Sequence, residues 1–251
     1  MTTYITTPLY YVNGKPHLGH AYTTVAADCL ARYYRLKDGK DQVFFLTGTD
    51  EHGQKIRQAA DEQKLEPKAF ADKIVVRFQD LWKKLSLTYD DFIRTTEKRH
   101  VDGVQAALAK LFEAGQIEKG MYEGWYCTPC ESFWSDQAVS GTKDVVCPDC
   151  KRSMERIQEE NYFFPLEPHR EWLIDHIKKN DQFVLPTTRR NEVLASLEKP
   201  LPPLCISRPV ARLNWGVSMP SPPFEENYVT YVWFDALLNY VTAVGFPKID
   251  Q

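Results

Sequence analysis

The sequence predicts an α/β fold built on an open, mostly parallel sheet. Residues 1 to about 115 alternate strand-like and helix-like segments, the order typical of such sheets. Within "QVFFLTGTD", the run Val43 to Leu46 is continuously apolar, which indicates a strand buried on both faces. "VNGKPHLGH" and "TGTDEHG" each follow a predicted strand. Because ligands bind at the carboxyl ends of strands in open α/β sheets, we expect both turns to face one crevice.

The first strand and helix are indicated by the composition of residues 4–37. "YITTPLYYV" is rich in β-branched and aromatic residues and predicts a strand, which "NGKP" ends as a turn. The helix is expected from His17 to Lys37, before Asp38-Gly39. Val25, Cys29 and Tyr33 recur every four residues, so we expect them to form its buried face.

Four further elements follow before residue 118. "EHGQKIRQAADEQK" predicts a helix, and "KAFADKIVVRFQDLWKKL" predicts another. The second has an apolar series at helical spacing: Phe70, Ile74, Phe78, Leu81 and Leu85. "DDFIRTT" predicts a short strand. A last helix, 97–117, is expected to have Thr95 or Thr96 as its N-cap and Gly115 near its end.

The pattern changes after residue 117. Residues 118–160 are short aromatic and cysteine-bearing segments, "HREWLIDHIKKN" predicts one helix, and "LEKPLPPLCISRPV" is rich in proline. "YVTYVWFDALLNYVTAV" is strand-like at first and helix-like after Asp235. We therefore expect an insertion at 118–207 within an α/β domain made of residues 1–117 and 208–251.

Composition limits the class of protein. The net charge is −3, so contact with nucleic acid would need a local basic patch. No run of about 18 apolar residues indicates a membrane span, and the N-terminus lacks the features of a secretory signal. We expect a cytoplasmic protein without a membrane partner.

Four of the six cysteines form two close pairs. Cys127 and Cys130, then Cys147 and Cys150, give C-x2-C, sixteen residues and C-x2-C. Two such turns can complete a tetrahedron of thiolates around zinc, and no open fourth position is indicated, so the site is expected to be structural. The alternative is two surface turns with free thiols.

His17 and His20 lie on one face of the first turn of the predicted helix, with Gly19 between them. The dipole and unpaired N–H groups at a helix N-terminus favour an anion such as phosphate, to which imidazoles can also donate. The chain has no GxGxxG at this turn and no GxxxxGK[ST]. A polar helix start with two solvated histidines is the alternative, and this stretch alone does not decide between them.

Motifs along nearly the whole chain resemble those of methionyl-tRNA synthetases, a family of class I aminoacyl-tRNA synthetases. "HLGH" is similar to the "HIGH" signature of that class. "FLTGTDEHGQKI", "RTTEKRH", "WYCTPCESFW", "ENYFFPL", "CISR" and "YVWFDALLNY" follow in the family's order. The resemblance implies a Rossmann-like catalytic domain with an inserted connective peptide carrying a zinc knuckle at 127–150. It also implies activation of methionine by ATP with Mg²⁺, then transfer to tRNA(Met).

The resemblance also implies roles for particular residues. His17 and His20 match the histidines that stabilise the ATP phosphates, Gly19 the glycine beneath adenine, and Arg208 a basic residue near the activated substrate. The residues that match the methionine pocket are Leu9, Tyr11, Asp50, Trp233, Ala236, Leu237 and Tyr240. Asp50 matches the carboxylate that receives the ammonium group, which needs a charged partner when buried. Aromatic rings suit the thioether.

Each of these positions has a structural alternative. Asp50 could be an N-cap, and Trp233 and Tyr240 could be core aromatic residues. Arg208 and Lys15 could be solvated. His52 and His100 are expected to be structural.

The resemblance stops short of the family's full pattern. The lysine- and serine-containing "KMSKS" loop, a further pocket segment and the helical anticodon-binding domain are not found in these 251 residues. "CISRPVAR" also departs from the usual Ser/Thr-Arg-Thr. We expect an N-terminal catalytic half that is monomeric and weakly active or inactive alone. Alternatives are another class I synthetase, or a non-catalytic zinc-bearing paralogue that binds tRNA or protein.

Overall fold

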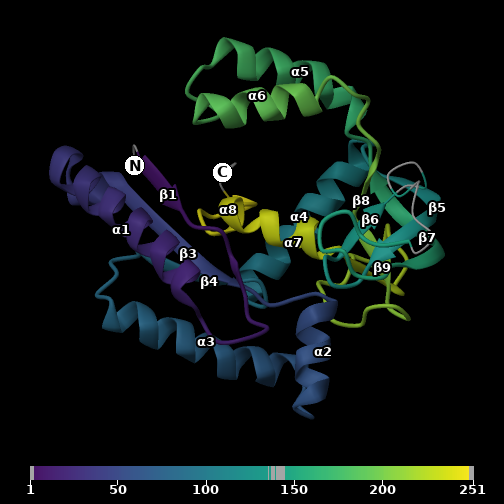
Figure 1. Cartoon of the computed structure of the whole chain (residues 1–251), viewed down its shortest axis with the longest axis horizontal. Coiled ribbons are helices and arrows are strands. Elements are labelled where there is room, and N and C mark those ends of the chain that lie inside the picture. The colour runs from purple at the N-terminus through teal and green to yellow at the C-terminus, as the bar shows by residue number, and fades with distance from the viewer. Residues whose placement is uncertain (1–2, 135, 137–138, 140–144, 249–251) are drawn as a thin grey trace.

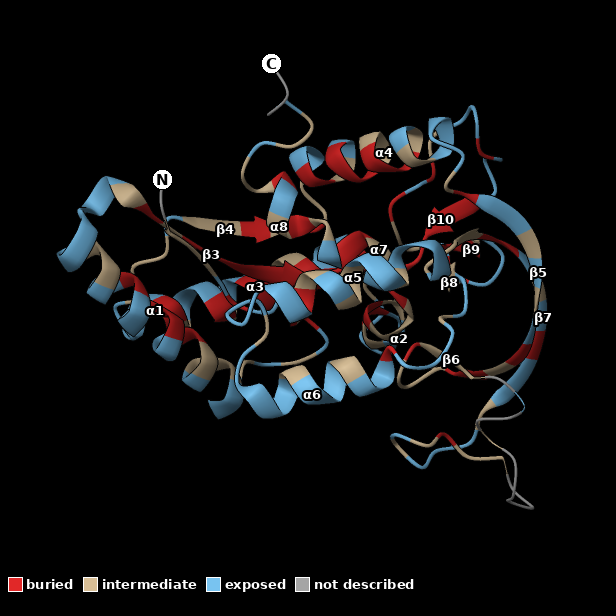
Figure 2. Cartoon of the chain, turned by 90° about the horizontal axis from the view of Figure 1, so that it is seen from above, coloured by how far each residue is buried: buried red, intermediate tan, exposed pale blue. Residues whose placement is uncertain are grey.

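The first part of the chain forms a parallel sheet, as expected for an α/β fold. The computed structural model describes residues 3–134, 136, 139 and 145–248. The strands of this sheet are β1 (Thr3–Thr6), β2 (Tyr10–Tyr11), β3 (Val43–Asp50) and β4 (Asp91–Arg94). Each of the other three pairs in parallel with β3, which is therefore the central strand. Figure 2 shows β3 buried along its length, and Figure 1 shows helices around the sheet.

The single strand expected for residues 4–12 is divided into β1 and β2. Pro8 lies between them, and proline has no N–H to donate to a ladder. Both pieces pair with β3, at Thr3–Thr6 and again at Tyr10–Tyr11. After the interruption, Tyr10 packs against the α3 side of the sheet, whereas the Tyr11 ring meets Trp233.

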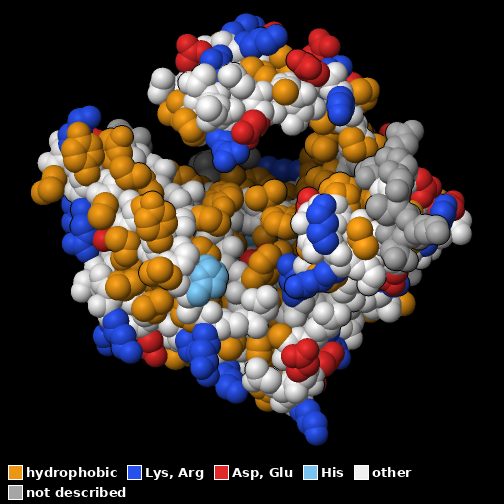
Figure 3. Space-filling view, viewed as in Figure 1, with side chains coloured by type: hydrophobic (Ala, Val, Ile, Leu, Met, Phe, Trp, Pro, Cys, Tyr) orange, Lys and Arg blue, Asp and Glu red, His pale blue; other side chains and the backbone are white. Residues whose placement is uncertain are grey.

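The helix α1 (Leu18–Asp38) forms where it was predicted, but its expected buried face is wrong. Val25, Cys29 and Tyr33 are exposed, and the buried residues are Thr24, Ala27, Asp28 and Ala31. Small side chains allow α1 to approach Val43 and Phe45 of β3 closely. Larger apolar side chains consequently lie on the outer surface of α1, where Figure 3 shows hydrophobic atoms gathered.

The helix α3 (Pro67–Lys84) provides much of the core. Phe70, Ile74 and Phe78 are buried as expected, together with Trp82. Leu81 is partly buried, but Leu85 is the exposed C-cap. Two shorter helices are η1 (Lys40–Gln42), which contacts α1, and α2 (Gln54–Glu62), which contacts α3.

The helix α4 (Lys98–Glu113) ends near Gly115 as predicted, but its expected N-cap is wrong. Glu97 is the N-cap, without a side-chain capping bond. The hydroxyls of Thr95 and Thr96 instead bind Glu51, by accepting from its backbone N–H and donating to its carboxylate. The buried residue Glu51 therefore binds both hydroxyls that were predicted to cap the helix, one through its backbone N–H and one through its carboxylate.

Residues 118–205 form a second, antiparallel sheet in the order β6-β5-β7-β8. Its strands are β5 (Glu118–Cys127), β6 (Ser132–Trp134), β7 (Glu155–Phe164) and β8 (Leu204–Cys205). Two helices, α5 (Glu167–Lys179) and α6 (Thr187–Ser196), form a hairpin between β7 and β8 (Figure 1). The sequence predicted α5 but not α6, which has no buried residue and therefore no strong apolar series.

The chain then packs against the first part again. β9 (Ser207–Pro209) pairs with β10 (Tyr228–Thr230), followed by α7 (Val232–Leu237) and α8 (Asn239–Thr242). The helix begins at Val232, before the expected start after Asp235. The α8 residue Thr242 packs against Gly103 of α4. Among the helices of the described residues, none combines the length and hydropathy that crossing a membrane needs.

Candidate active site and metal site

The two histidines of the "HLGH" turn cap the N-terminus of α1. His17 Nδ1 accepts from the Gly19 N–H at 3.1 Å, and His20 Nδ1 accepts from the His17 N–H at 3.2 Å. In a neutral imidazole that accepts at Nδ1, the proton lies on Nε2. Both rings therefore present an Nε2–H donor. Because two backbone N–H groups at this turn are already paired with the rings, a phosphate here would meet imidazoles first.

The two rings are held in a fixed arrangement. Their centroids are 3.7 Å apart, and His20 rests against Tyr10 and Phe78, at 4.7 and 5.3 Å. A Cβ at position 19 would lie 3.0 Å from Cε1 of His17, so glycine leaves room for the capping ring. Burial and the neighbouring His17 lower the pKa of His20. The lowered pKa favours the neutral form of His20 near pH 7.

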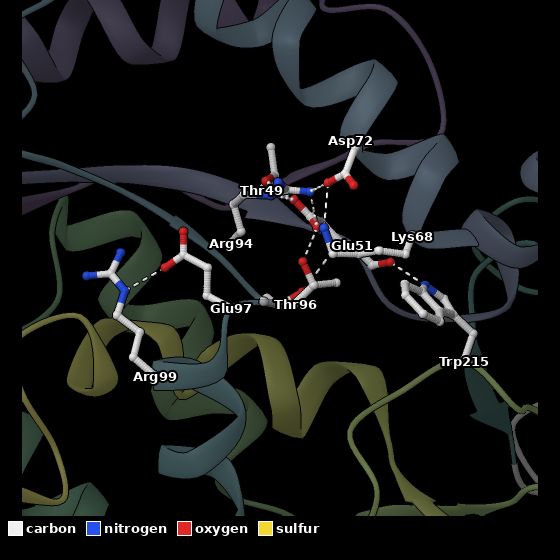
Figure 4. A network of polar contacts seen from close by, with 10 residues as sticks. Thr49, Glu51, Lys68, Asp72, Arg94, Thr96, Glu97, Arg99 and Trp215 are labelled. Atoms are coloured by element: carbon white, nitrogen blue, oxygen red, sulfur yellow. Dashed lines mark hydrogen bonds and ion pairs between the residues drawn. The ribbon is translucent and has the colours of Figure 1, made fainter. Parts of the chain in front are cut away.

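Two adjacent carboxylates at the end of β3 have opposite surroundings. Glu51 is fully buried and accepts from Arg94 Nε at 2.6 Å and Arg94 Nη2 at 2.9 Å (Figure 4). Thr49 and Thr96 also donate to the Glu51 carboxylate, at 2.7 and 2.5 Å. Figure 4 shows Arg94 between Glu51 and Asp72, so the charge of Glu51 is satisfied within the protein.

Asp50 has no cationic partner of this kind among the residues that the structure describes. Its side chain accepts from the His52 backbone N–H, but Oδ1 is buried without a hydrogen-bond partner among the described residues. Burial, together with the charges of Asp235, Glu131 and Glu51, raises the pKa of Asp50 well above its ordinary value. A cationic ligand at Oδ1 would remove this penalty. Gly53 is the N-cap of α2, so Asp50 does not have the capping role that was its alternative.

Tyr11, which lies beside Asp50, and Trp233 form an aromatic wall. Tyr11 is the register partner of Asp50 across β2 and β3, and the Tyr11 ring meets Trp233 edge-on at 6.4 Å. Trp233 is 43% exposed, so it is not a core residue. Tyr240 is half-buried and donates to the Thr7 carbonyl at 3.3 Å. Of the other expected pocket residues, Leu9 is half-buried, Ala236 is buried and Leu237 is exposed.

A buried chain of side chains fixes α7 behind this wall. Asp235 Oδ2 lies 2.6 Å from His52 Nδ1, and Asp235 Oδ1 lies 2.7 Å from His100 Nε2. His100 continues to Thr242 at 2.9 Å. Although burial opposes its charge, the two histidines lower the pKa of Asp235. His52 and His100 are therefore structural, as expected, and connect the Asp50 loop to α4 and α7.

The structure does not bring Arg208 to the histidine turn. Its guanidinium is buried between Tyr126 and Phe133, 4.1 and 4.2 Å from the ring centroids, and forms an ion pair with Glu159. The expected contact with ATP does not fit this position, because aromatic rings and a carboxylate already surround the charge. The solvated alternative is wrong as well, whereas Lys15 is exposed.

The four paired cysteines converge on one point. The sulfurs of Cys127, Cys130, Cys147 and Cys150 all lie within 4.8 Å of one another. Two of the separations are 3.5 Å, between Cys127 and Cys150, and 3.9 Å, between Cys130 and Cys147. Four thiolates at zinc–sulfur bond lengths form a tetrahedron with edges of about 3.8 Å. The donor set and spacing therefore fit a tetrahedral metal such as zinc.

The parallel sheet, the histidine turn at its edge and the cysteine-bearing insertion together define a class I aminoacyl-tRNA synthetase domain. Comparison with known families agrees. The family described as "tRNA synthetases class I (M)" matches residues 3–158 and 151–250. The chain belongs to this family.

Relatives with curated names support the same assignment. The methionine–tRNA ligases of Clostridium tetani and Thermotoga maritima are each 49% identical, over 251 and 252 residues. Each alignment covers 100% of this chain, but 38% and 39% of the relative. The chain thus spans less than half the length of these relatives.

Solved structures extend the comparison. Methionyl-tRNA synthetase of Mycobacterium tuberculosis bound by methionyl-adenylate has a TM-score of 0.91 and 36% identity, over 100% of this chain and 48% of that one. The free form of that enzyme has a TM-score of 0.79 and 34% identity, over 100% of this chain and 47% of that one. The fold described above therefore lies closer to the adenylate-bound form of that protein.

Sequence reasoning missed several residues that shape the site. Glu51, Arg94 and Trp215 hold the loop after Asp50, since Trp215 Nε1 donates to the Glu51 carbonyl at 2.5 Å. Glu131 and Asp235 were also missed. Their partners are up to 183 positions away in the chain, so short motifs carried no signal for them. Glu131 was identifiable only as the residue after a cysteine pair.

Proposed function

We propose that this chain is the N-terminal catalytic part of a methionine–tRNA ligase. The enzyme would activate methionine with ATP to methionyl-adenylate and transfer the methionyl group to tRNA(Met). Family membership and 49% identity to curated ligases support this proposal. So does the better agreement with a relative bound by methionyl-adenylate than with the free form.

The observation that carries the proposal is the unpaired oxygen of Asp50. A buried carboxylate without a cation is costly, and the neighbouring Glu51 shows that this loop can satisfy a carboxylate completely. An amino-acid ammonium would supply the missing charge at Asp50. Tyr11, which lies beside Asp50, and Trp233, which meets the Tyr11 ring edge-on, would contact the substrate side chain through aromatic surfaces that suit a thioether.

The arrangement suits a reaction that needs positioning and charge stabilisation. A carboxylate oxygen of methionine would attack the α-phosphorus of ATP, and the bond to the bridging oxygen would break to release pyrophosphate. Nε2–H groups of His17 and His20 would donate to phosphate oxygens as negative charge develops. The reaction requires no nucleophilic side chain, because the substrate carboxylate itself is the nucleophile.

Two metals accompany the proposed reaction. One zinc per chain, held by the four cysteines, would keep the two cysteine turns together. Mg²⁺ would enter with ATP and neutralise part of the phosphate charge. We further propose the division into a catalytic first half (1–117), a connective insertion (118–207) and a return segment (208–251), in a monomeric cytoplasmic protein.

The experiment is ATP–pyrophosphate exchange with the protein expressed from the complete gene. We expect exchange that depends on methionine and is much weaker with leucine, isoleucine, valine or cysteine. His17→Asn and His20→Asn should each lower the exchange rate about 100-fold, in the range of lost oxyanion donors, whereas the exposed His169→Asn should not. An intact protein without methionine-dependent exchange would contradict the proposal. Preference for another amino acid would assign a different class I synthetase.

A further inference from the structure

Glu131 links the cysteine knuckle to the candidate amino-acid site. It directly follows Cys130, is 1% exposed and has a φ of 49°, a backbone conformation that few residues other than glycine adopt. Its N–H donates to the Thr128 carbonyl at 3.2 Å, which closes the turn between the two cysteines. The knuckle therefore fixes the position from which the Glu131 side chain extends.

The Glu131 carboxylate reaches the loop that follows Asp50. Oε1 accepts from the Lys55 N–H at 3.1 Å, in the first turn of α2, and the Gln54 N–H also donates to this carboxylate. A Cβ on Gly53 would lie 2.7 Å from Oε1, so glycine is required for this close approach. The beginning of α2, four residues after Asp50, is thus capped by a side chain from residues 118–207.

The same residue contacts two further parts of the site. Tyr11 Oη donates to Glu131 Oε2 at 3.4 Å, and Tyr231 Oη donates to the Glu131 carbonyl. Tyr11 belongs to the aromatic wall, and Tyr231 is the N-cap of α7, which carries Trp233. One buried residue therefore touches β2 and the start of α7, which supply the wall, and the start of α2, which follows Asp50.

We propose that Glu131 is a positioning residue for the methionine site and couples metal binding at the four cysteines to the affinity for methionine. The proposal rests on the proposed function. When the knuckle is folded around its metal, Glu131 holds β2, the start of α2 and the start of α7 in fixed positions relative to one another. When the knuckle unfolds, all three segments lose a shared partner. Methionine affinity is then expected to depend on a metal that does not touch methionine.

The test measures methionine binding by calorimetry, in the absence of ATP, on the zinc-loaded protein from the complete gene. Glu131→Ala should weaken methionine binding about tenfold, the loss expected for one charged hydrogen bond. Glu131→Gln keeps a carbonyl acceptor for Lys55 and should recover part of the affinity. Asp149→Asn is the matched control, because Asp149 is an exposed acid of the second cysteine pair, without a hydrogen bond or ion pair in the described structure.

Two further measurements, metal content and the effect of zinc removal, distinguish a positioning role of Glu131 from an indirect effect through unfolding of the knuckle. Glu131→Ala should retain one zinc per chain, measured by elemental analysis. Removing zinc should weaken methionine binding in the wild type by about as much as the substitution does, and should cause little further loss in Glu131→Ala. Methionine affinity within twofold of the wild type in zinc-loaded Glu131→Ala would overturn the proposal. So would a further loss of affinity on zinc removal from Glu131→Ala that is as large as the loss in the wild type. If Glu131→Ala does not fold, the proposal is tested by methionine binding to Glu131→Gln and to the zinc-free wild type, both of which should be weaker than in the zinc-loaded wild type. Wild-type protein that binds no methionine would instead overturn the proposed function.

Discussion

Asp50 and Glu51 follow each other in the chain, and both carboxylates are buried, but Glu51 is paired with Arg94 while Asp50 Oδ1 has no partner in the described structure. Successive residues at a strand end project to opposite sides, which accounts for the difference. One carboxylate therefore holds the loop together, and the other is available to a cation.

This difference predicts that replacing Asp50 stabilises the folded protein but weakens binding of a cationic ligand at that position. Asp50→Asn should raise the free energy of unfolding by about 1–3 kcal/mol, because it removes a buried charge that lacks a cation. Chemical denaturation of the 251-residue chain measures the change. Asp80→Asn, on the exposed face of α3, is the control and should have no effect. Destabilisation by Asp50→Asn would show that the carboxylate has an essential partner within the protein.

The same substitution should change the pH dependence of stability. The raised pKa means that folded Asp50 keeps its proton after the unfolded chain has lost its own, above the ordinary value of 3.8. The unfolded state then binds fewer protons, so the stability contributed by this group falls as pH rises through that window. The advantage of Asp50→Asn over the wild type should accordingly be small at acidic pH and grow toward neutrality. A constant difference across the titration would argue against the unpaired carboxylate.

Asp235→Asn should have the opposite effect on stability. Asp235 binds both His52 and His100 and is fully buried, so an amide cannot accept from both rings equally. We expect a loss of about 3 kcal/mol in the free energy of unfolding, as for a broken buried pair. Denaturant titration alongside Asp80→Asn measures it. A change below 1 kcal/mol would mean that the His52–Asp235–His100 chain contributes little.

Cys147→Ser tests the metal site. The substitution removes one of four sulfur ligands, so zinc content should fall from one per chain toward zero and the two cysteine turns should become sensitive to protease. Cys29→Ser is the control, since Cys29 is exposed and lies outside the cluster. Chelation should have the same effect on the wild type and little on Cys147→Ser. Full zinc content in that variant would contradict the assigned ligands.

Helical spacing of apolar residues led to correct predictions where large apolar side chains face the core, and failed where they do not. The α3 helix was predicted from its apolar spacing because three large side chains pack on one face. The same rule failed for α1, where small residues face the sheet and large ones face outward. The helix α6 was missed because it is amphipathic only weakly and buries no residue.

The candidate site was likewise predictable only where a local sequence pattern encodes the geometry. The cysteine quartet was predictable because its spacing encodes the metal geometry, and the structure brings all four sulfurs together. The prediction for Arg208 was wrong because a short motif carries no information on distant contacts. Tyr126, Phe133 and Glu159, which surround Arg208, lie far from it in the sequence. Glu131 contacts Tyr11 across 120 positions, a distance at which the sequence alone gives no indication of contact.

The most direct test of the central claim compares methionine with N-acetylmethionine, which lacks the ammonium, in equilibrium binding to the protein from the complete gene. If Asp50 receives the ammonium, wild-type protein should prefer methionine by about 100-fold, and Asp50→Asn should lose most of that preference, since a buried charged pair is lost. The proposed thioether contacts with Tyr11 and Trp233 are shared by both ligands. Because the acetyl group also adds bulk, it is the change in preference between the wild type and Asp50→Asn that reports the charge. Unchanged preference for methionine in Asp50→Asn would contradict the account.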